Sequence, residues 1–393
     1  MNPKNQIPKD WKWVKLGEVC DKISLNKIKI KQKDYLEEGT YPVIDQGQEL
    51  IGGYYNDKNL VIPTEPPYII FGDHTKVKKF INFKFIAGAD GVKVLKAKDN
   101  IDSKFLYYSF YTIKIEDKGY ARHFQLLEKE LFPLPPKPTQ QVIVSKIEEL
   151  FSELDKGIEN LHAAQQQLKT YRQSVLKWAF EGKLTNENVK EGELPEGWKI
   201  VELKEVCEIK RGKSKHRPRN ERSLYGGKYP FIQTGDIRNA SGGYINKYSQ
   251  TYNEKGFQQS KLWPKGTLCI TIAANIGETA ILGFDSCFPD SVVGLLCNEK
   301  MILNKYTNYF FISFKQKLAK LAPATAQKNI NVDILEKVEI PLPTIEEQNK
   351  IIQEIESRLS VADKMEESIT QSLQQAEALR QSILKKAFEG KLI

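Results

Sequence analysis

Two long stretches of the chain place apolar residues at helical spacing. In residues 133–185 the apolar positions recur at alternating steps of four and three, which is the seam of a heptad repeat. The seam positions are Val144, Ile147, Phe151, Leu154, Ile158, Leu161, Gln165, Leu168, Arg172, Val175 and Ala179. Residues 341–393 repeat the seam with Ile352, Ile355, Leu359, Ile369, Leu373 and Ile383, interrupted by Glu366 and Arg380. Both stretches therefore predict long helices with one apolar side.

The ends of these helices are marked as well. Each stretch begins at Pro-Leu-Pro, at 133–135 and 341–343, and proline is excluded from a helix interior. Thr344 and Glu347 form a capping-box pattern, and Gly182 and Gly390 are placed as C-terminal glycines. Two helices of this kind pack most simply on each other. An antiparallel pair is favoured because a globular block lies between them, and the alternative is that each helix packs on its own domain.

The intervening blocks predict mixed α/β structure. Short β-like runs such as VIPTEPPYIIF and TLCITIA stand among Gly-rich turns. One helix is expected in each block, near residues 103–114 and 304–321. Residues 27–33, KIKIKQK, alternate strictly. This predicts a strand with Lys27, Lys29, Lys31 and Lys33 on one face and Ile28 and Ile30 on the other.

The chain is internally duplicated. AFEGKL occurs at 179–184 and again at 387–392, and residues 133–184 match 341–392 without a gap at 24 of 52 positions. A fainter match joins IPKDWKWVKLGEVC (7–20) to LPEGWKIVELKEVC (194–207), and YPVIDQG (41–47) to YPFIQTG (229–235). We therefore expect two α/β globular domains (1–132 and 186–340) and two spacer helices (133–185 and 341–393). The predicted class is mixed α+β, with an antiparallel coiled coil and an internal pseudo-twofold repeat.

Length and composition narrow the class of protein. The chain has 393 residues, 40% of them apolar, which is enough for two or more cores. No apolar run is long enough for a membrane span, and the start MNPKNQIPKDWKW has no signal core, so we expect a cytoplasmic protein. The five cysteines form no CxxC pair, which disfavours a disulfide framework or a zinc site. Cys20 and Cys207, in LGEVC and LKEVC, are expected in the core.

Positive charge is concentrated in the globular blocks. The formal net charge of the chain is +9. Residues 1–132 carry 22 basic against 18 acidic residues and residues 194–340 carry 22 against 14, whereas both helical blocks are slightly acidic. The densest run is KRGKSKHRPRNER at 210–222. This distribution indicates that the globular blocks contact a polyanion and leave the helices for a protein partner. A solvated loop is the alternative for the basic run.

The chain shows no convincing catalytic motif. RGKS at 211–214 resembles the end of a phosphate-binding loop, but Cys207 stands where that loop needs a glycine. EPPY at 65–68 resembles the Asn/Asp-Pro-Pro-Tyr of amino-methyltransferases, but it begins with Glu65 and follows no glycine-rich turn. We interpret it as the start of the strand YIIF. The four histidines, His74, His123, His162 and His216, show no ligand spacing. No metal site and no catalytic residue are predicted.

The whole pattern resembles the specificity subunit of a type I restriction-modification system. The resemblance rests on Pro-Leu-Pro with Gln140 or Gln348, on the ends RQSVLKWAFEGKL and RQSILKKAFEGKL, and on Trp11 and Trp198. YPFIQTGDI and FPDSVVGL in the second variable block add to it. It implies two target-recognition domains that each read half of a split, asymmetric DNA sequence. It further implies a non-catalytic chain that docks two modification subunits and, through the complex, restriction subunits. S-adenosylmethionine and ATP would bind to those partners.

Candidate contact residues follow from the chemistry of DNA readout. Arg and Lys suit guanine, Asn and Gln suit adenine, and Lys, Ser and Thr meet phosphates. In the first domain the candidates are Gln46, Gln48, His74, Thr75, Lys76, Arg122 and Gln125; in the second they are Lys213, Lys215, Arg217, Arg219, Thr234, Asp236, Arg238, Asn275, Gln327 and Lys328. A capping or turn role is the alternative for Asp236, Asn275 and Gln125.

The twin helix ends are candidates for partner contacts. They keep identical residues off the seam, at Gln173, Lys177, Phe180 and Lys183 and at Gln381, Lys385, Phe388 and Lys391. Pairing of the helices needs only the seam, so the outer faces are predicted to bind two copies of one partner. Two other functions remain open at this point. One is a self-sufficient DNA methyltransferase, and the other is a coiled-coil scaffold without sequence-specific DNA binding.

Overall fold

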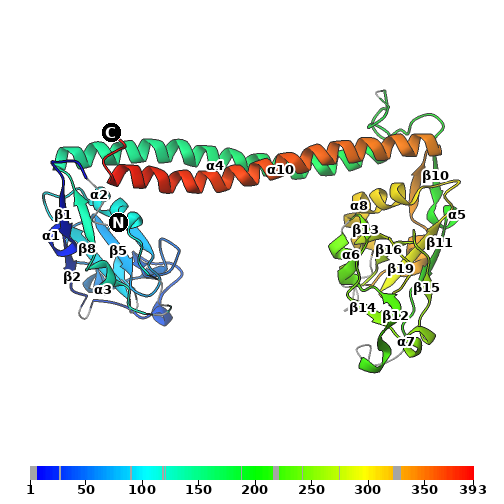
Figure 1. Ribbon diagram of the computed structural model, residues 1–393, viewed down its shortest axis with the longest axis horizontal. Helices are drawn as coiled ribbons and strands as arrows, with labels where there is room; N and C mark the ends of the chain where they lie inside the picture. The colour runs from blue at the N-terminus through cyan, green and yellow to red at the C-terminus, as the bar shows by residue number, and fades with distance from the viewer. Residues whose placement is uncertain are drawn as a thin grey trace. The chain divides into compact units, whose positions relative to one another are not determined.

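The structure is a computed structural model of the chain. It describes residues 7–25, 28–88, 91–116, 119, 121–186, 188–215, 221–240, 242–273, 275–321 and 329–393. The chain forms two compact units. Unit 1 comprises Met1–Ala163 with Thr370–Ile393, and unit 2 comprises Ala164–Ile369. Each long helix thus contributes one segment to each unit (Figure 1).

Unit 1 is built on two small sheets. Its strands are β1 (Lys12–Lys15), β2 (Cys20–Ile23), β3 (Tyr41–Ile44), β4 (Gly53–Tyr55), β5 (Tyr68–Gly72), β6 (Lys78–Ile81), β7 (Ile86–Ala87), β8 (Val92–Ala97) and β9 (Leu131–Leu134). Its short helices are α1 (Leu16–Val19), α2 (Ser103–Ser109) and α3 (Phe124–Leu127), with 3-10 turns at Gln32–Asp34, Lys58–Leu60 and Phe110–Thr112. The sheet orders are β2-β8-β5-β6 and β4-β3-β7, and β1 pairs with β9.

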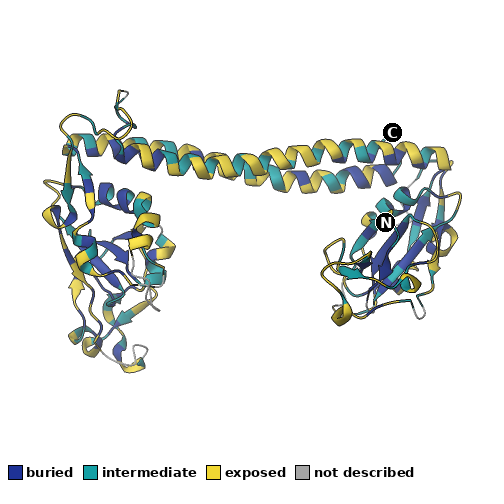
Figure 2. Cartoon of the chain, turned by 180° about the vertical axis from the view of Figure 1, so that it is seen from behind, coloured by how far each residue is buried: buried dark blue, intermediate teal, exposed yellow. Residues whose placement is uncertain are grey.

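Strand β5 separates two cores because its side chains alternate between the faces of the sheet. Ile69 and Phe71 pack with Leu106 of α2, whereas Tyr68 and Ile70 pack against the second sheet. Both faces of the strand are covered, so all five of its residues are buried (Figure 2). The predicted strand YIIF is confirmed.

Unit 2 repeats this plan with more elements. Its strands are β10 (Lys199–Glu202), β11 (Cys207–Arg211), β12 (Tyr225–Phe231), β13 (Tyr244–Ile245), β14 (Gln250–Tyr252), β15 (Leu262–Trp263), β16 (Leu268–Thr271), β17 (Thr279–Leu282), β18 (Ser286–Cys287), β19 (Val292–Cys297) and β20 (Glu339–Leu342). Its short helices are α5 (Leu203–Val206), α6 (Thr234–Ala240), α7 (Glu254–Gln258), α8 (Asn304–Leu321) and α9 (Val332–Glu336), with a 3-10 turn at Arg222–Leu224. The sheet orders are β11-β19-β16-β17-β13 and β14-β12-β18-β15, and β10 pairs with β20.

The two units, which correspond to the repeats in the sequence, also pair their strands in the same way. Gly72 at the end of β5 lies opposite Val92 of β8, as Thr271 at the end of β16 lies opposite Val292 of β19. The strand that contains Tyr-Pro has one parallel neighbour in both units: β7 for β3, and β18 for β12. The predicted mixed α/β class with an internal repeat is therefore confirmed.

The predicted long helices are α4 (Lys137–Phe180) and α10 (Ile345–Phe388). In unit 1 Phe151 faces Arg380, and Ile143 and Phe388 share one core; in unit 2 Phe180 and Ile355 share another. The segments of α4 and α10 thus run antiparallel within each unit. The apolar seam is buried or half-buried throughout, as predicted.

The polar interruptions of the seam are ion pairs. In unit 2 Arg172 binds Asp363 and Glu366, at 2.5 and 2.7 Å. In unit 1 Arg380 binds Asp155. Arg172 and Arg380 occupy equivalent positions of the repeat, and so do Asp155 and Asp363. The interruptions therefore match each other between the two units.

The repeated glutamines of the two spacer helices bind the start of an earlier helix in each core, α2 or α8. Gln140 is buried, donates to the Pro135 carbonyl at 2.9 Å and accepts from the Asp102 N–H at 2.8 Å. Gln348 does the same with the carbonyls of Pro343 and Met301 and with the N–H of Leu303. Asp102 caps α2, and Leu303 directly precedes α8. These glutamines hold each spacer helix onto its globular core.

Two local predictions are corrected. Residues 28–33 form no strand: they contain one isolated bridge at Lys29 and the 3-10 turn Gln32–Asp34, and Lys27 lies outside the described residues. Alternation alone could not make a strand there, since no neighbouring strand pairs with it along its length. At the start of α10 the Glu347 N–H donates to Thr344, but the Glu347 carboxylate accepts from Thr185 and Asn186 instead of closing a capping box.

Candidate nucleic-acid interface

The candidate residues of unit 1 meet where β5 ends and β8 begins. The turn Asp73–Val77 follows β5, and the Asp73 N–H donates to Gly91 at 2.7 Å. The backbone of Lys76 is left-handed, with φ of +57°, which closes the turn through its N–H to Gly72. Gln46 follows β3 and reaches this turn. Its side-chain oxygen accepts from the His74 N–H at 3.2 Å, and its carbonyl accepts from Thr75 Oγ1 at 2.8 Å.

A third segment, residues 121–125, completes the unit 1 cluster. His74 Nδ1 lies 3.2 Å from the Ala121 carbonyl, next to the exposed side chain of Arg122. The Phe124 N–H donates to the Asp73 carboxylate at 2.8 Å, which brings the backbone next to exposed Gln125 close to the turn. Gln48 and Thr75 line one hollow of about 480 Å³ with Lys76 and Lys78. The structure thus brings together all seven predicted residues of this unit.

Two glycines make room for Gln46. A Cβ added to Gly72 would lie 2.3 Å from Thr75 Oγ1 and 2.9 Å from the Gln46 Cβ. One added to Gly91, where φ is +95°, would lie 2.6 Å from Gln46 Oε1. Both glycines are therefore needed for this close approach.

Two charged residues that the sequence did not single out organise the unit 1 cluster. Asp73 is buried, and its carboxylate binds Lys93 at 3.2 Å in addition to the Phe124 N–H. Lys79 is also buried, donates to the Glu49 carbonyl and lies 3.7 Å from Asp45. Burial lowers the pKa of Lys79. No spacing rule points to such residues, because their partners come from other strands.

The candidate residues of unit 2 lie at the corresponding end of its sheet. Lys213 and Lys215 follow β11 and have exposed side chains. The Lys213 N–H donates to Phe288, and its carbonyl accepts from Ser260. The turn after β16 carries exposed Asn275, whose carbonyl accepts from Thr271. Because Arg211 pairs with Val293 and Thr271 with Val292, both segments leave the sheet at the same end.

Helix α6 carries the remaining described candidates. Exposed Arg238 and half-buried Thr234 lie on it. The Asp236 carboxylate accepts from the Gln233 N–H at 2.8 Å and from Ser249 at 3.2 Å. This is the capping role that the sequence left open for Asp236. Arg217, Arg219, Gln327 and Lys328 lie outside the described residues.

The predicted partner surface is corrected at both phenylalanines. Phe180 packs against Tyr306 and Phe310, with ring centroids at 5.1 and 5.4 Å, and Phe388 packs against Phe105 at 4.9 Å. Both are buried, so neither can meet a partner. They are repeated because each fastens a helix end to its own core. Gln173, Lys177, Gln381, Lys385 and Lys391 are exposed, and Lys183 is half-buried.

Part of the lysine repeat also has an internal explanation. Glu181 binds Lys177 and Lys183, at 3.6 and 3.0 Å. Glu389 binds Lys385 and Lys391, at 3.9 and 2.8 Å. The same ion pairs thus close both helix ends.

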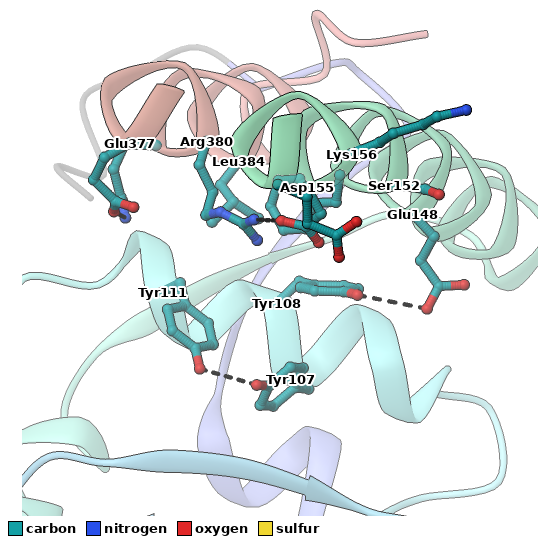
Figure 3. Close-up of a pocket in the computed structure, with 13 residues that line it drawn as sticks. Tyr107, Tyr108, Tyr111, Glu148, Ser152, Asp155, Lys156, Glu377, Arg380 and Leu384 are labelled. Carbon is teal, nitrogen blue, oxygen red and sulfur yellow. Dashed lines mark hydrogen bonds and ion pairs between the residues drawn. The ribbon is translucent and has the colours of Figure 1, made fainter. Parts of the chain in front are cut away.

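Gln381 lines a tyrosine-rich cavity of about 780 Å³ between α2 and the long helices of unit 1 (Figure 3). Tyr107 and Tyr111 join their hydroxyls there at 2.9 Å, and Tyr108 donates to Glu148. Burial and Glu148 raise the pKa of Tyr108 to about 12. Four acidic residues, Glu148, Asp155, Glu159 and Glu377, line this cavity against two basic ones, Lys156 and Arg380, and Arg380 is paired with Asp155, so the cavity does not suit DNA phosphates.

The chain matches a known family over both halves of its duplication. Residues 8–162 and 195–377 each match the family described as the type I restriction modification DNA specificity domain. The chain belongs to this family. The resemblance predicted from the sequence is thereby confirmed, and so is the prediction of a DNA-specificity chain.

Curated relatives carry the same description. Over 283 residues the chain is 28% identical to the specificity subunit of the type I restriction enzyme EcoBI from Escherichia coli, covering 68% of this chain and 59% of that protein. Over 416 residues it is 26% identical to the specificity subunit of the type I restriction enzyme MjaVIII from Methanocaldococcus jannaschii, covering 98% and 94%.

Solved structures show the same fold. The chain superimposes on the HsdS subunit from Thermoanaerobacter tengcongensis with a TM-score of 0.63 and 21% identity, over 99% of each chain. A chain from a structure of type I R-M complex assembly and conformational transition reaches a TM-score of 0.72, also at 21% identity, over 98% of this chain and 99% of that chain. Among the described helices of our chain, none is long and apolar enough to cross a membrane.

Proposed function

We propose that this chain reads a bipartite, asymmetric DNA target for a type I restriction-modification complex. The observation that carries the proposal is the matched position of the two candidate clusters. Gln46, His74 and Thr75 lie where β5 and β8 of unit 1 meet, and Lys213 and Asn275 lie at the equivalent end of the sheet in unit 2. Two copies of one fold with different side chains at one place suit two half-sites of different sequence.

The side chains divide by chemistry between phosphates and base edges. Exposed Lys213 and Lys215 suit phosphates, since a lysine acts as a point charge without base preference. Gln48, Arg122 and Asn275 are exposed and can form the paired hydrogen bonds that distinguish adenine or guanine in the major groove. Gln46 is already bonded to the turn, so its role is to hold His74 and Thr75 in position.

We further propose that the chemistry belongs to partner subunits. Modification subunits would bind S-adenosylmethionine, restriction subunits would use ATP, and the complex would act in the cytoplasm. Two modification subunits would dock on exposed residues of the helix ends, such as Gln173 and Lys177 in unit 2 and Gln381 and Lys385 in unit 1.

The EPPY segment gives little support to the alternative of a self-sufficient methyltransferase. Tyr68 is buried in a core and its hydroxyl donates to the Thr64 carbonyl, so it is not offered to a substrate amine, and exposed Glu65 pairs with Lys84 at 2.6 Å.

The test is to express the chain with the modification subunit from its neighbouring gene and to map methylated bases in genomic DNA. We expect the methylated sites to share one split sequence. Replacing Gln48 and Arg122 by Ala should change the first half of that sequence and leave the second half unchanged. Substituting Asn275→Ala should change the other half only. Methylation without a shared sequence would favour a scaffold. Binding of S-adenosylmethionine to the isolated chain, measured by calorimetry, would favour a methyltransferase.

A further inference from the structure

Two cysteines of unit 2 face each other across neighbouring strands. Cys207 begins β11 and Cys297 ends β19, and the two are direct partners in the antiparallel register. Their Sγ atoms lie 2.8 Å apart. All five cysteines of the chain are free thiols in the structure. Cys207 and Cys297 are therefore two thiols in contact and not a disulfide.

The register places these cysteines at a position where a disulfide fits. The N–H of Asn298 donates to Val206, and the N–H of Gly212 donates to Val292. Hydrogen-bonded pairs alternate along an antiparallel ladder, so the pair 207/297 falls between them in the non-hydrogen-bonded class. Its Cα atoms are therefore about 4.5 Å apart, within the range that a disulfide spans.

The two thiols differ in access. Cys207 is buried at 5% exposure, and its contact with Cys297 together with burial raises the pKa of its thiol. Cys297 is half-buried and lines an open hollow of about 820 Å³. Lys265 and Lys300 line the same hollow with one acid, Glu299. A small anionic molecule can thus reach Cys297 but not Cys207.

We infer that Cys297 and Cys207 form a reversible redox pair that is oxidised by a low-molecular-weight, anionic disulfide entering the hollow beside Lys265 and Lys300. The Cys297 thiolate attacks one sulfur of the small disulfide, forming a mixed disulfide and releasing one thiolate. Cys207 then attacks the Cys297 sulfur and releases the second thiolate. The two protons lost by the cysteines leave with the two small thiols, so one disulfide is reduced as one is formed.

The bond would act on an edge strand next to the candidate interface. β11 is the outermost strand of its sheet, where β19 is its one partner among the described strands. It leads directly into Lys213 and Lys215. A link at its other end joins strands 90 residues apart in sequence. The oxidised chain should consequently melt several degrees higher than the reduced chain.

The other domain provides an internal control. Cys20 occupies the position equivalent to Cys207, but its partner across the strands is Ala97. Cys20 is buried, and burial raises its pKa to about 12. It has no second thiol opposite it and should remain reduced.

The experiment incubates the full chain with oxidised glutathione at graded ratios to reduced glutathione, then alkylates the free thiols and analyses peptides by mass spectrometry. We expect loss of two alkylated thiols and a linked peptide containing Cys207 and Cys297. The variant C207S should stop at a glutathione adduct on Cys297, and C297S should form neither product. Cystamine, a cationic disulfide, should react more slowly than oxidised glutathione in C207S.

Three results would overturn the inference. They are full alkylation of both cysteines at every ratio, an adduct on Cys20 in preference to Cys297, or equal rates with the cationic reagent. Circular dichroism of C207S and C297S verifies that each variant is folded before the reaction, so that an unreactive chain counts against the proposal.

Discussion

Gly390, just past the end of α10, faces Pro8: a Cβ added to Gly390 would lie 2.4 Å from the Pro8 Cγ. Gly182, just past the end of α4, faces Pro195 in the same way, at 2.2 Å. Both glycines are left-handed, with φ of +68° and +75°. The end of α10 thus packs against the start of the first repeat, and the end of α4 packs against the start of the second repeat. Each helix end is closed by the Pro-x-x-Trp turn of one repeat.

The first prediction concerns this contact. Substituting Gly390→Ala should lower the free energy of unfolding by more than the roughly 1–2 kcal/mol that a left-handed non-glycine residue costs. The excess reflects the clash with Pro8. Urea denaturation of the full chain measures it.

Gly192→Ala is the matched control, because Gly192 is also left-handed, with φ of +85°, but no described residue lies within 4 Å of an added Cβ. Equal losses for the two variants would show that the contact with Pro8 is unimportant.

The second prediction concerns the buried glutamines. Gln348→Leu should lower the free energy of unfolding by about 1–3 kcal/mol, since it leaves the Leu303 N–H and two carbonyls without their partner. Gln140→Leu should cost a similar amount through the Asp102 N–H. Denaturant unfolding is the measurement, and Gln141→Leu, on the exposed side of α4, is the control. A loss at Gln141 as large as at Gln140 would contradict this assignment.

The third prediction concerns phosphate contacts. Replacing Lys213 and Lys215 by Ala should weaken DNA binding for every sequence and reduce the log-log salt dependence by about one per lost contact. Fluorescence anisotropy at several salt concentrations measures the slope. Lys199→Ala serves as the control, since Lys199 is exposed on β10, away from the sheet end that carries the cluster. An unchanged slope in the double variant would remove these lysines from the interface.

The fourth prediction is a pH dependence in unit 1. Burial, aided by Lys76, lowers the pKa of Lys78 from 10.5 to about 8. The unfolded chain therefore binds more protons at this residue between pH 8 and 10.5, so unfolding free energy should rise with pH across that window. The Lys78 ammonium also lies 4.6 Å from the Tyr111 ring, which favours the charged form and moderates the effect.

Comparison with Lys78→Met isolates this residue from other groups that titrate in the same range. The difference in unfolding free energy between wild type and variant should shift in favour of wild type from pH 8 to 10.5. A difference that stays constant with pH would show that Lys78 titrates normally.

The long helices, the duplication and the family could all be predicted from the amino-acid sequence. A heptad seam is a local pattern, and each seam residue from Val144 to Val175 lies on the same helix face whatever it packs against. Repeated segments likewise need no structure to be recognised. For the same reason Gly182 and Gly390 were identified from position alone, as residues that follow a periodic run.

The roles of the repeated and polar residues depend on tertiary contacts that the sequence does not show. Phe180 and Phe388 lie off the seam in sequence, but helices α8 and α2 cover them, and helical spacing cannot show what packs on the other side of a helix. KIKIKQK alternates like a strand yet finds no continuous partner. The clusters around His74 and Lys213, and the contact of Cys207 with Cys297, depend on which strand ends and registers coincide. Strand pairing brings together residues 90 positions apart, and a local sequence pattern does not predict which distant residues will pair.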